Sequence, residues 1–119
     1  MSDKKKKTYD RGIMAEGVAE LFLRAKGFEI LARRYKTPVG EIDLVALDDA
    51  YLVFIEVKAR PTIDDAMYSI TPKMRERIHA AAGHFTMHYP DYANHPMRVD
   101  VMAVKLPFTI HHLENAFME

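Results

Sequence analysis

The stretch GEIDLVALDDAYLVFIEVK at residues 40–58 decides how this chain folds. Two largely apolar segments, Glu41–Leu47 and Tyr51–Ala59, lie on either side of the turn-forming residues Asp-Asp-Ala at 48–50. Strand-forming residues that flank a short turn are typical of a β-hairpin. The sequence therefore predicts two adjacent antiparallel strands at the centre of the fold.

This hairpin gathers its charged residues at its open end. If residues 49–50 form a two-residue loop, Asp43 lies opposite Glu56. Glu41 then lies opposite Lys58, and directly opposed residues share a face of the sheet with Cβ atoms about 5 Å apart. The other face is wholly apolar and consists of Ile42, Leu44, Ala46, Val53, Ile55 and Val57. A register slip of one residue would move the charges to different faces.

The charged end has the composition of a site for a divalent cation. Two carboxylates held side by side repel each other, and Mg²⁺ relieves that repulsion because it binds carboxylate oxygens while keeping several waters. Lys58, two residues after Glu56, points to the same face and could orient an attacking water or stabilise charge on a phosphate. The alternative is a buried salt-bridge network that fixes the hairpin register. Glu41 is either a metal ligand or the partner that neutralises Lys58.

An amphipathic helix is expected before the hairpin. Residues 9–26 carry apolar side chains at helical spacing, and Gly27 stands where a helix commonly ends. A neighbouring face of this helix combines very small residues with one carboxylate, Glu16. Because small residues allow close approach to a sheet, we expect Glu16 to reach the carboxylate cluster. The alternative for Glu16 is an exposed position on the helix surface.

The rest of the chain contains further strands and one more helix. Thr71 followed by Pro72 is a typical helix start, because threonine caps the N-terminus and proline suits the first helical position. The predicted segments are a strand at 28–35, a turn at 37–40, a loop at 61–69, a helix from 71 to about 88, a strand at 98–106, and an edge strand with a helical turn within 108–117. The predicted order is αβββαβ.

Length and composition predict one domain. The chain has 119 residues, of which 49% are hydrophobic, and the domain is predicted at residues 9–119. Residues 1–8 contain a run of lysines and are predicted to form a disordered basic tail. No segment is apolar enough to cross a membrane and there is no cysteine, so a cytoplasmic location is expected. Basic and acidic residues both number 17, although this balance can hide a basic rim around an acidic centre.

The helix and the two strand motifs together resemble a known nuclease superfamily. Glu-Ile-Asp at 41–43 and Glu-Val-Lys at 56–58, preceded by a helix bearing Glu16, look like the PD-(D/E)xK superfamily of restriction-type enzymes and archaeal Holliday-junction resolvases. More closely, motifs along almost all of the chain resemble the YraN family, small bacterial proteins of predicted endonuclease fold. These motifs are Gly12, Ala15-Glu16, Ala19, Gly27, GEIDL at 40–44, VFIEVKAR at 53–60, Lys73, RVDV at 98–101 and NAF at 115–117.

The resemblance implies an α/β fold with a restriction-endonuclease-like αβββαβ core, a mixed sheet flanked by helices. The implied site residues are the metal ligands Asp43, Glu56 and the backbone carbonyl of Val57, the catalytic lysine Lys58 and the helix-borne acid Glu16. The implied cofactor is Mg²⁺ or Mn²⁺. The superfamily's proline before the metal-binding aspartate is Ile42 here, a departure tolerated in resolvase-like members.

Together, the residues and the resemblance predict a metal-dependent endonuclease that hydrolyses phosphodiester bonds of DNA. Branched or distorted duplexes are the expected substrates, because the chain is too short for a separate sequence-reading domain and backbone and shape contacts would suffice. A homodimer would carry two sites and could cut two strands. The alternative is a non-catalytic nucleic-acid-binding or assembly module that retains the nuclease fold.

Other charged residues are expected around this site. The candidates for supporting or DNA-binding roles are Glu41, Arg60, Lys73 and Arg77. Lys73 lies in the first turn of the second helix, a region that borders the site in resolvase-like relatives. For Lys73 and Arg77, the alternative is a solvated helix face. Asp100 beside Arg98 is expected to form a structural ion pair, and the histidines lack the spacing of a zinc site.

Overall fold

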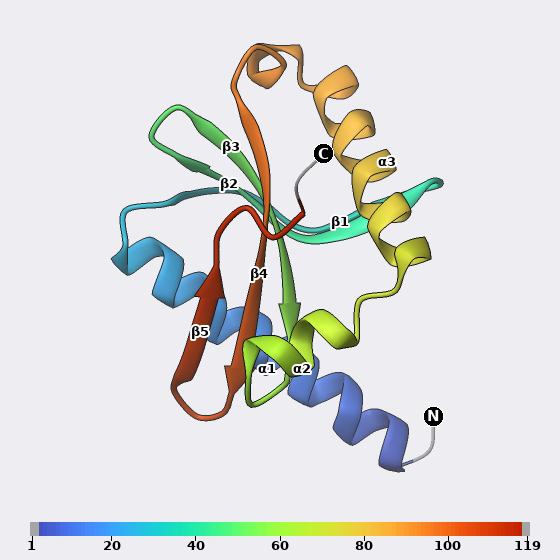
Figure 1. The fold of residues 1–119 in the computed structure, drawn as a ribbon, viewed down its shortest axis with the longest axis vertical. Helices are drawn as coiled ribbons and strands as arrows, with labels where there is room; N and C mark the ends of the chain where they lie inside the picture. Colours follow the sequence, from blue (N-terminus) through green and yellow to red (C-terminus); the bar gives the residue numbers. More distant parts are fainter. Residues whose placement is uncertain (1–2, 118–119) are drawn as a thin grey trace.

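The computed structural model describes residues 3–117 and contains a five-stranded mixed sheet with helices packed against it (Figure 1). Its elements are α1 (Asp3–Ala25), β1 (Glu29–Thr37), β2 (Gly40–Asp48), β3 (Tyr51–Lys58), α2 (Ile63–Tyr68), α3 (Pro72–His88), the 3-10 helix η1 (Pro90–Tyr92), β4 (Met97–Lys105) and β5 (Thr109–Leu113). The strand order is β1-β2-β3-β4-β5, with β3 and β4 parallel and the other neighbours antiparallel. The predicted fold class and αβββαβ order are confirmed.

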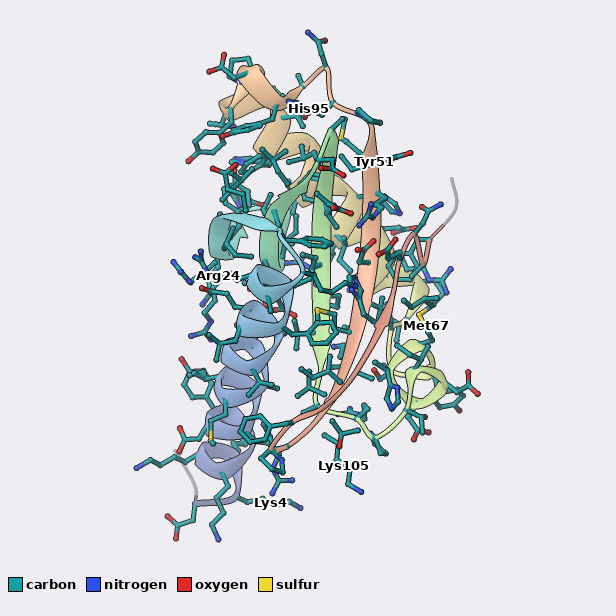
Figure 2. All side chains as sticks on the ribbon, turned by 90° about the vertical axis from the view of Figure 1, so that its left-hand side faces the viewer. Lys4, Arg24, Tyr51, Met67, His95 and Lys105 are labelled. Carbon is teal, nitrogen blue, oxygen red and sulfur yellow. The ribbon has the colours of Figure 1, made fainter. Side chains whose placement is uncertain are left out.

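The central strands are buried on both faces because α1 covers one face and α3 the other (Figure 2). On the α1 side, Ala15, Ala19 and Leu23 pack against the sheet, and their small size brings the helix close to the strands. On the α3 side, Ile78 and Phe85 belong to a second apolar cluster. The sheet therefore separates two apolar layers. Among the helices of residues 3–117, none is both long and apolar enough to cross a membrane.

α1 is longer at its start than the sequence predicts. It begins at Asp3 and includes the lysine run that was expected to form a disordered tail. Lysine has a high helix propensity, and Asp3 in the first turn interacts favourably with the positive end of the helix dipole. The first two residues of the expected tail lie outside the described residues. The end agrees with prediction, because the helix stops at Ala25 and Gly27 adopts a φ of +95°.

α2 corrects the expectation of a loop over residues 61–69. Thr62 caps this short helix, since its hydroxyl accepts a hydrogen bond from the backbone N–H of Asp65 at 3.0 Å. Ala66 is its buried residue. So short and exposed a helix has no apolar periodicity that the sequence could reveal.

α3 agrees with its prediction. The hydroxyl of Thr71 accepts a hydrogen bond from the N–H of Met74 at 3.1 Å, and Pro72 occupies the first turn. Ile78 and Phe85 of the predicted stripe are buried. The cap and the apolar stripe together fix which face of α3 contacts the sheet.

β5 is the expected edge strand, but residues 114–115 form a turn instead of a helical turn, with Asn115 at a φ of +52°. This turn completes a buried polar network around Asp100 of β4. Asp100 accepts hydrogen bonds from Arg98 at 3.0 Å, His112 at 2.8 Å and the N–H of Asn115 at 2.9 Å. Although burial opposes it, these bonds lower the pKa of Asp100. The expected ion pair of Arg98 and Asp100 is confirmed.

The alternation of side chains along β2 changes phase near the predicted site. Leu44 packs on the α1 side, but Ile42 packs on the α3 side together with Val45. The expectation that Ile42 shares a face with Leu44 is therefore wrong. The phase changes at Asp43, whose side chain accepts the N–H of Val57 in place of a regular backbone ladder bond.

Gly40 sets the distance between β2 and α3. A Cβ at this position would overlap with the backbone carbonyl oxygen of Arg77 and lie 2.8 Å from its carbonyl carbon. We expect Gly40→Ala to lower the free energy of unfolding by roughly 1–3 kcal/mol, because strand and helix must move apart. Urea denaturation measures this change.

Gly12→Ala is the matched control for this substitution. Gly12 lies inside α1, and a Cβ there meets nothing within 4 Å. Alanine at this position should increase stability by up to about 1 kcal/mol through helix propensity alone. A Gly40→Ala protein as stable as wild type would contradict the close approach of β2 and α3.

Candidate functional site

The β2–β3 hairpin has the predicted register. Its pairs run from Asp48 opposite Tyr51 at the turn to Leu44 opposite Ile55 toward the open end. Regular pairing ends there, and Asp43 and Glu56 are the next residues on the two strands. The site therefore begins where the two strands separate.

The carboxyl group of Asp43 bridges this separation. Its Oδ2 accepts a hydrogen bond from the backbone N–H of Val57 at 2.7 Å. The same carboxyl group lies close enough to the carboxyl group of Glu56 for each to shift the pKa of the other. The side chain of Glu56 is only 11% exposed. Two largely buried acids are thus held against each other by the local backbone.

Their environment raises the proton affinity of both acids. Burial, followed by the nearby charge of Asp43, raises the pKa of Glu56 to about 9. Burial also raises the pKa of Asp43, although the hydrogen bond from Val57 opposes this effect. Without a cation, the pair therefore retains a proton at neutral pH. A divalent cation that binds the two carboxylates has to displace this proton.

Lys58 lies beside these acids, with its Nζ 3.6 Å from Oε1 of Glu56. Residues two apart on a strand point to the same face, which explains the contact. The structure pairs Lys58 with Glu56 and not with Glu41, the partner weighed from the sequence. Glu41 is exposed and lies opposite Lys36 of β1. A role for Glu41 at a metal remains a prediction.

α1 brings Glu16 close to Asp43 from one face of the sheet. Its side chain is 19% exposed, and its Oε1 lies 3.6 Å from Nε of Arg34. Burial and the neighbouring Asp43 raise the pKa of Glu16 to about 6. Glu16 and Asp43 share a hollow of about 300 Å³, whose other lining residues are Tyr9, Arg34, Lys36, Glu41 and Ile42.

A smaller hollow of about 130 Å³ opens on the α3 side. It is lined by Glu41, Glu56, Met74, Arg77 and Ile78. Arg77 thus lies where the sequence placed a supporting cation, and Glu41 is on the rim of both hollows. Lys73 is exposed, one turn before Arg77, and lines neither of them.

Arg60 lies in a third hollow, of about 520 Å³, just beyond the end of β3. Arg11 of α1 and Lys105 at the end of β4 line the same hollow. Its other lining residues are Ala59, Pro61, Val104 and Leu106, so its walls carry three cations and no carboxylate. The parallel pairing of β3 and β4 brings the ends of both strands to this place.

The donor set fits a partly hydrated hard cation. Within the described part of the chain, no group of three or more His, Cys, Asp or Glu side chains is arranged to hold a metal ion. Asp43 and Glu56 offer two carboxylates, and Mg²⁺ commonly binds through one or two carboxylates while retaining waters. Mn²⁺ suits the same oxygen ligands. The backbone carbonyl of Val57 as a third ligand remains a prediction.

Three residues at the rim were missed by reasoning from sequence, namely Tyr9, Arg34 and Lys36. Arg34 contacts Glu16 and donates from Nη1 to the hydroxyl of Tyr9 at 3.2 Å. Its φ of +49° is unusual for a residue other than glycine and follows a bulge in β1. The spacing of Arg34 and Lys36 could have indicated that they share a face. No sequence pattern connected Tyr9 with them.

The acids and the lysine lie within a region that matches a known family. A sequence model described as "Uncharacterised protein family UPF0102" matches residues 15–104. A UPF0102 protein of Rhodopseudomonas palustris (strain BisB5) is 48% identical over 92% of this chain and 83% of its own length. The corresponding values are 47%, 92% and 85% for a protein of strain HaA2 of the same species. For a protein of Nitrobacter winogradskyi they are 43%, 92% and 92%.

The raised pKa of Glu56 predicts how the metal-free protein responds to pH. Its pKa is about 9 in the folded protein and near the ordinary 4.5 when unfolded, so the folded state binds the proton more tightly. Stability should therefore fall as pH rises from about 5 to 9. We expect Glu56→Gln to flatten this decline of Tm measured in EDTA. The exposed Glu76→Gln is the control, and an equally steep decline in Glu56→Gln would contradict the prediction.

Proposed function

Because this chain belongs to the UPF0102 family, the YraN family that its sequence resembles, and the names of its relatives state no activity, we propose a function from the site itself. The protein is an Mg²⁺- or Mn²⁺-dependent endonuclease that hydrolyses phosphodiester bonds of DNA. The observation that carries this proposal is the pair of neighbouring, largely buried carboxyl groups of Asp43 and Glu56, with Lys58 beside Glu56. The absence of cysteine is compatible with action in the reducing cytoplasm.

Four residues have separate roles in the proposed hydrolysis, namely Asp43, Glu56, Lys58 and Glu16. Asp43 and Glu56 would hold the cation once their carboxyl groups are both deprotonated. When bound, the cation supplies positive charge to the phosphate and lowers the pKa of nearby water. Lys58 orients the attacking water. It also stabilises the negative charge that develops on the phosphate as the water oxygen bonds to phosphorus. Glu16, with a pKa of about 6, accepts the proton that this water loses.

Hydrolysis of the phosphodiester requires water as its only other reactant. The water oxygen forms a bond to phosphorus, and the bond from phosphorus to one ester oxygen breaks. The leaving oxygen takes up a proton, so the products are a phosphate monoester and a hydroxyl group.

Cations around the site favour a nucleic acid over a small substrate. Arg34 and Lys36 line the hollow on the α1 side, and Arg77 lines the one on the α3 side. Beyond Lys58, the hollow at Arg60 adds three more cations, namely Arg60, Arg11 and Lys105. These positions extend past a single phosphate, as a substrate with a repeating phosphate backbone requires. The net charge of the chain is zero, although basic residues surround an acidic centre.

Branched or distorted DNA is the substrate class that we propose. The rim cations are suited to phosphates, and phosphate contacts position a duplex without reading its sequence. Selectivity would then come from the shape and deformability of the DNA. A homodimer would present two sites to two strands.

Cleavage should depend on Lys58. We expect purified protein with Mg²⁺ or Mn²⁺ to cut branched or flapped DNA faster than linear duplex. Lys58→Ala and the longer, uncharged Lys58→Met should each lower the rate at least about 100-fold, because charge stabilisation in the transition state is lost. Gel analysis of end-labelled substrates measures the rates.

Lys26→Ala is the matched control. Lys26 is a partly exposed lysine that directly follows the C-terminal end of α1. It should cut at close to the wild-type rate. Circular dichroism checks that every variant is folded. Cleavage that survives both Lys58 substitutions, or no cleavage of any DNA, would contradict the enzymatic proposal. Binding of DNA without cleavage would instead favour a non-catalytic module.

Metal binding can be measured without activity. At pH 8 we expect Mg²⁺ or Mn²⁺ to raise the Tm of the wild-type protein, because the cation binds the folded state. Asp43→Asn and Glu56→Gln should each lose most of this increase. Asp64→Asn, an exposed change in α2, should retain it. An equal increase in Asp43→Asn would place the cation elsewhere.

A further inference from the structure

α1 carries an apolar surface on the side that faces away from the sheet. Leu21 is 69% exposed, Met14 is 59% exposed and Ile13 is 40% exposed. Gly17 lies among them, and a Cβ built there meets nothing within 4 Å. We call Ile13, Met14, Gly17 and Leu21 the outer face of α1. In Figure 2, α1 lies on the outside of the molecule and Arg24 points away from the strands.

This outer face is opposite the buried side of the same helix. Ala15, Ala19 and Leu23 pack against the sheet and are at most 1% exposed. With a turn of 3.6 residues, the positions of the outer face fall on the other side of the helix axis. Isolated exposed apolar residues are common on protein surfaces, but several on successive turns of one helix mark an interaction surface.

Two exposed charges of opposite sign stand at the two ends of the outer face. Asp10 precedes it and Arg24 follows it, at equal sequence distances from Gly17. Arg24 contacts Glu20 at 2.9 Å, yet its side chain remains 48% exposed. The outer face is therefore apolar in the middle, negative at one end and positive at the other.

We infer that the outer face of α1 binds the outer face of a second copy of the chain, with the two helices antiparallel. A two-fold axis at Gly17 places Ile13 of each copy opposite Leu21 of the other. The same axis places Asp10 of each copy opposite Arg24 of the other. A two-fold interface uses one surface twice, so that surface has to be complementary to itself.

The symmetry about Gly17 favours a second copy over an unrelated partner. An unrelated partner would require neither charges of opposite sign at equal distances from a central residue nor the apolar pair Ile13 and Leu21, each four residues from Gly17. Gly17 at the axis has no side chain to hold the two helices apart, and helix separation depends on the residues at the contact. The dimer would have two ion pairs at its rim and one apolar centre, to which both copies contribute.

This interface lies beside the candidate active site, because Ile13 and Gly17 of the outer face line one hollow with Glu16 and Arg34. Glu16 itself contacts Arg34 of β1 and is outside the outer face. The inference rests on the outer face alone, whether or not the protein is a nuclease. If both proposals hold, α1 links two active sites within one particle.

Sedimentation velocity over a range of protein concentrations tests the association. We expect the wild-type protein to form a reversible dimer. Leu21→Asp should raise its dissociation constant at least tenfold, because it places a charge in the apolar centre. Met87→Asp is the matched control, since Met87 is 80% exposed on α3, and it should change the constant less than twofold. A wild-type protein that stays monomeric, or a Leu21→Asp protein that dimerises equally well, would overturn the inference.

Charge reversal tests the antiparallel pairing directly. Asp10→Arg and Arg24→Asp are made in separate proteins. In a dimer of either variant, like charges would face each other at both ends of the interface. Each protein alone should therefore be mainly monomeric. An equal mixture should dimerise at least as well as wild type, because both pairs are then of opposite charge. Mixtures that dimerise no better than either protein alone would exclude this pairing.

A cross-link provides a measurement that does not depend on charge. The chain has no cysteine, so Gly17→Cys introduces a single thiol at the proposed axis. A short bis-maleimide should convert this protein to a covalent dimer, whereas Met87→Cys should stay monomeric. Equal cross-linking of both proteins would count against a contact at Gly17.

Discussion

The hydrogen bond from the Val57 N–H to the carboxylate of Asp43 is the contact on which the site depends. A regular hairpin would join these strands through backbone atoms alone. Here a side chain takes over one bond at the point where the ladder ends, so the strands can separate without leaving a donor unsatisfied. This arrangement holds Asp43 against Glu56. Lys58 follows on the same strand face and completes the group.

The two flanking helices convert this strand end into a site with access from both faces. α1 approaches the sheet closely through Ala15 and Ala19, which brings Glu16 near Asp43. α3 also approaches the sheet closely, because Gly40 leaves room for the backbone of Arg77. Small residues on opposite faces therefore have the same effect, which is to place long charged side chains around one pair of acids.

The hairpin and its register could be predicted because two strands with one turn admit few pairings, and apolar alternation selects among them. The pairing of Leu44 with Ile55 follows from that pattern. The position of Ile42 does not, because its change of face results from a bond between a side chain and the backbone. Arg34 also escaped prediction, since its contact with Glu16 joins two elements. Periodicity within one segment carries no information about such contacts between segments.

Asp100 shows what this fold does with a buried acid whose role is structural. Its two oxygens receive hydrogen bonds from Arg98, His112 and a backbone N–H, and these bonds lower its pKa despite burial. Asp43 and Glu56, on the neighbouring strands, are two acids that share one ammonium group and one N–H between them. The same sheet thus contains one buried acid whose charge is neutralised by its hydrogen bonds, Asp100, and two acids that repel each other, Asp43 and Glu56. This chain neutralises one buried carboxylate and leaves two others to repel each other, so a cation bound between those two would add to the stability of the folded state.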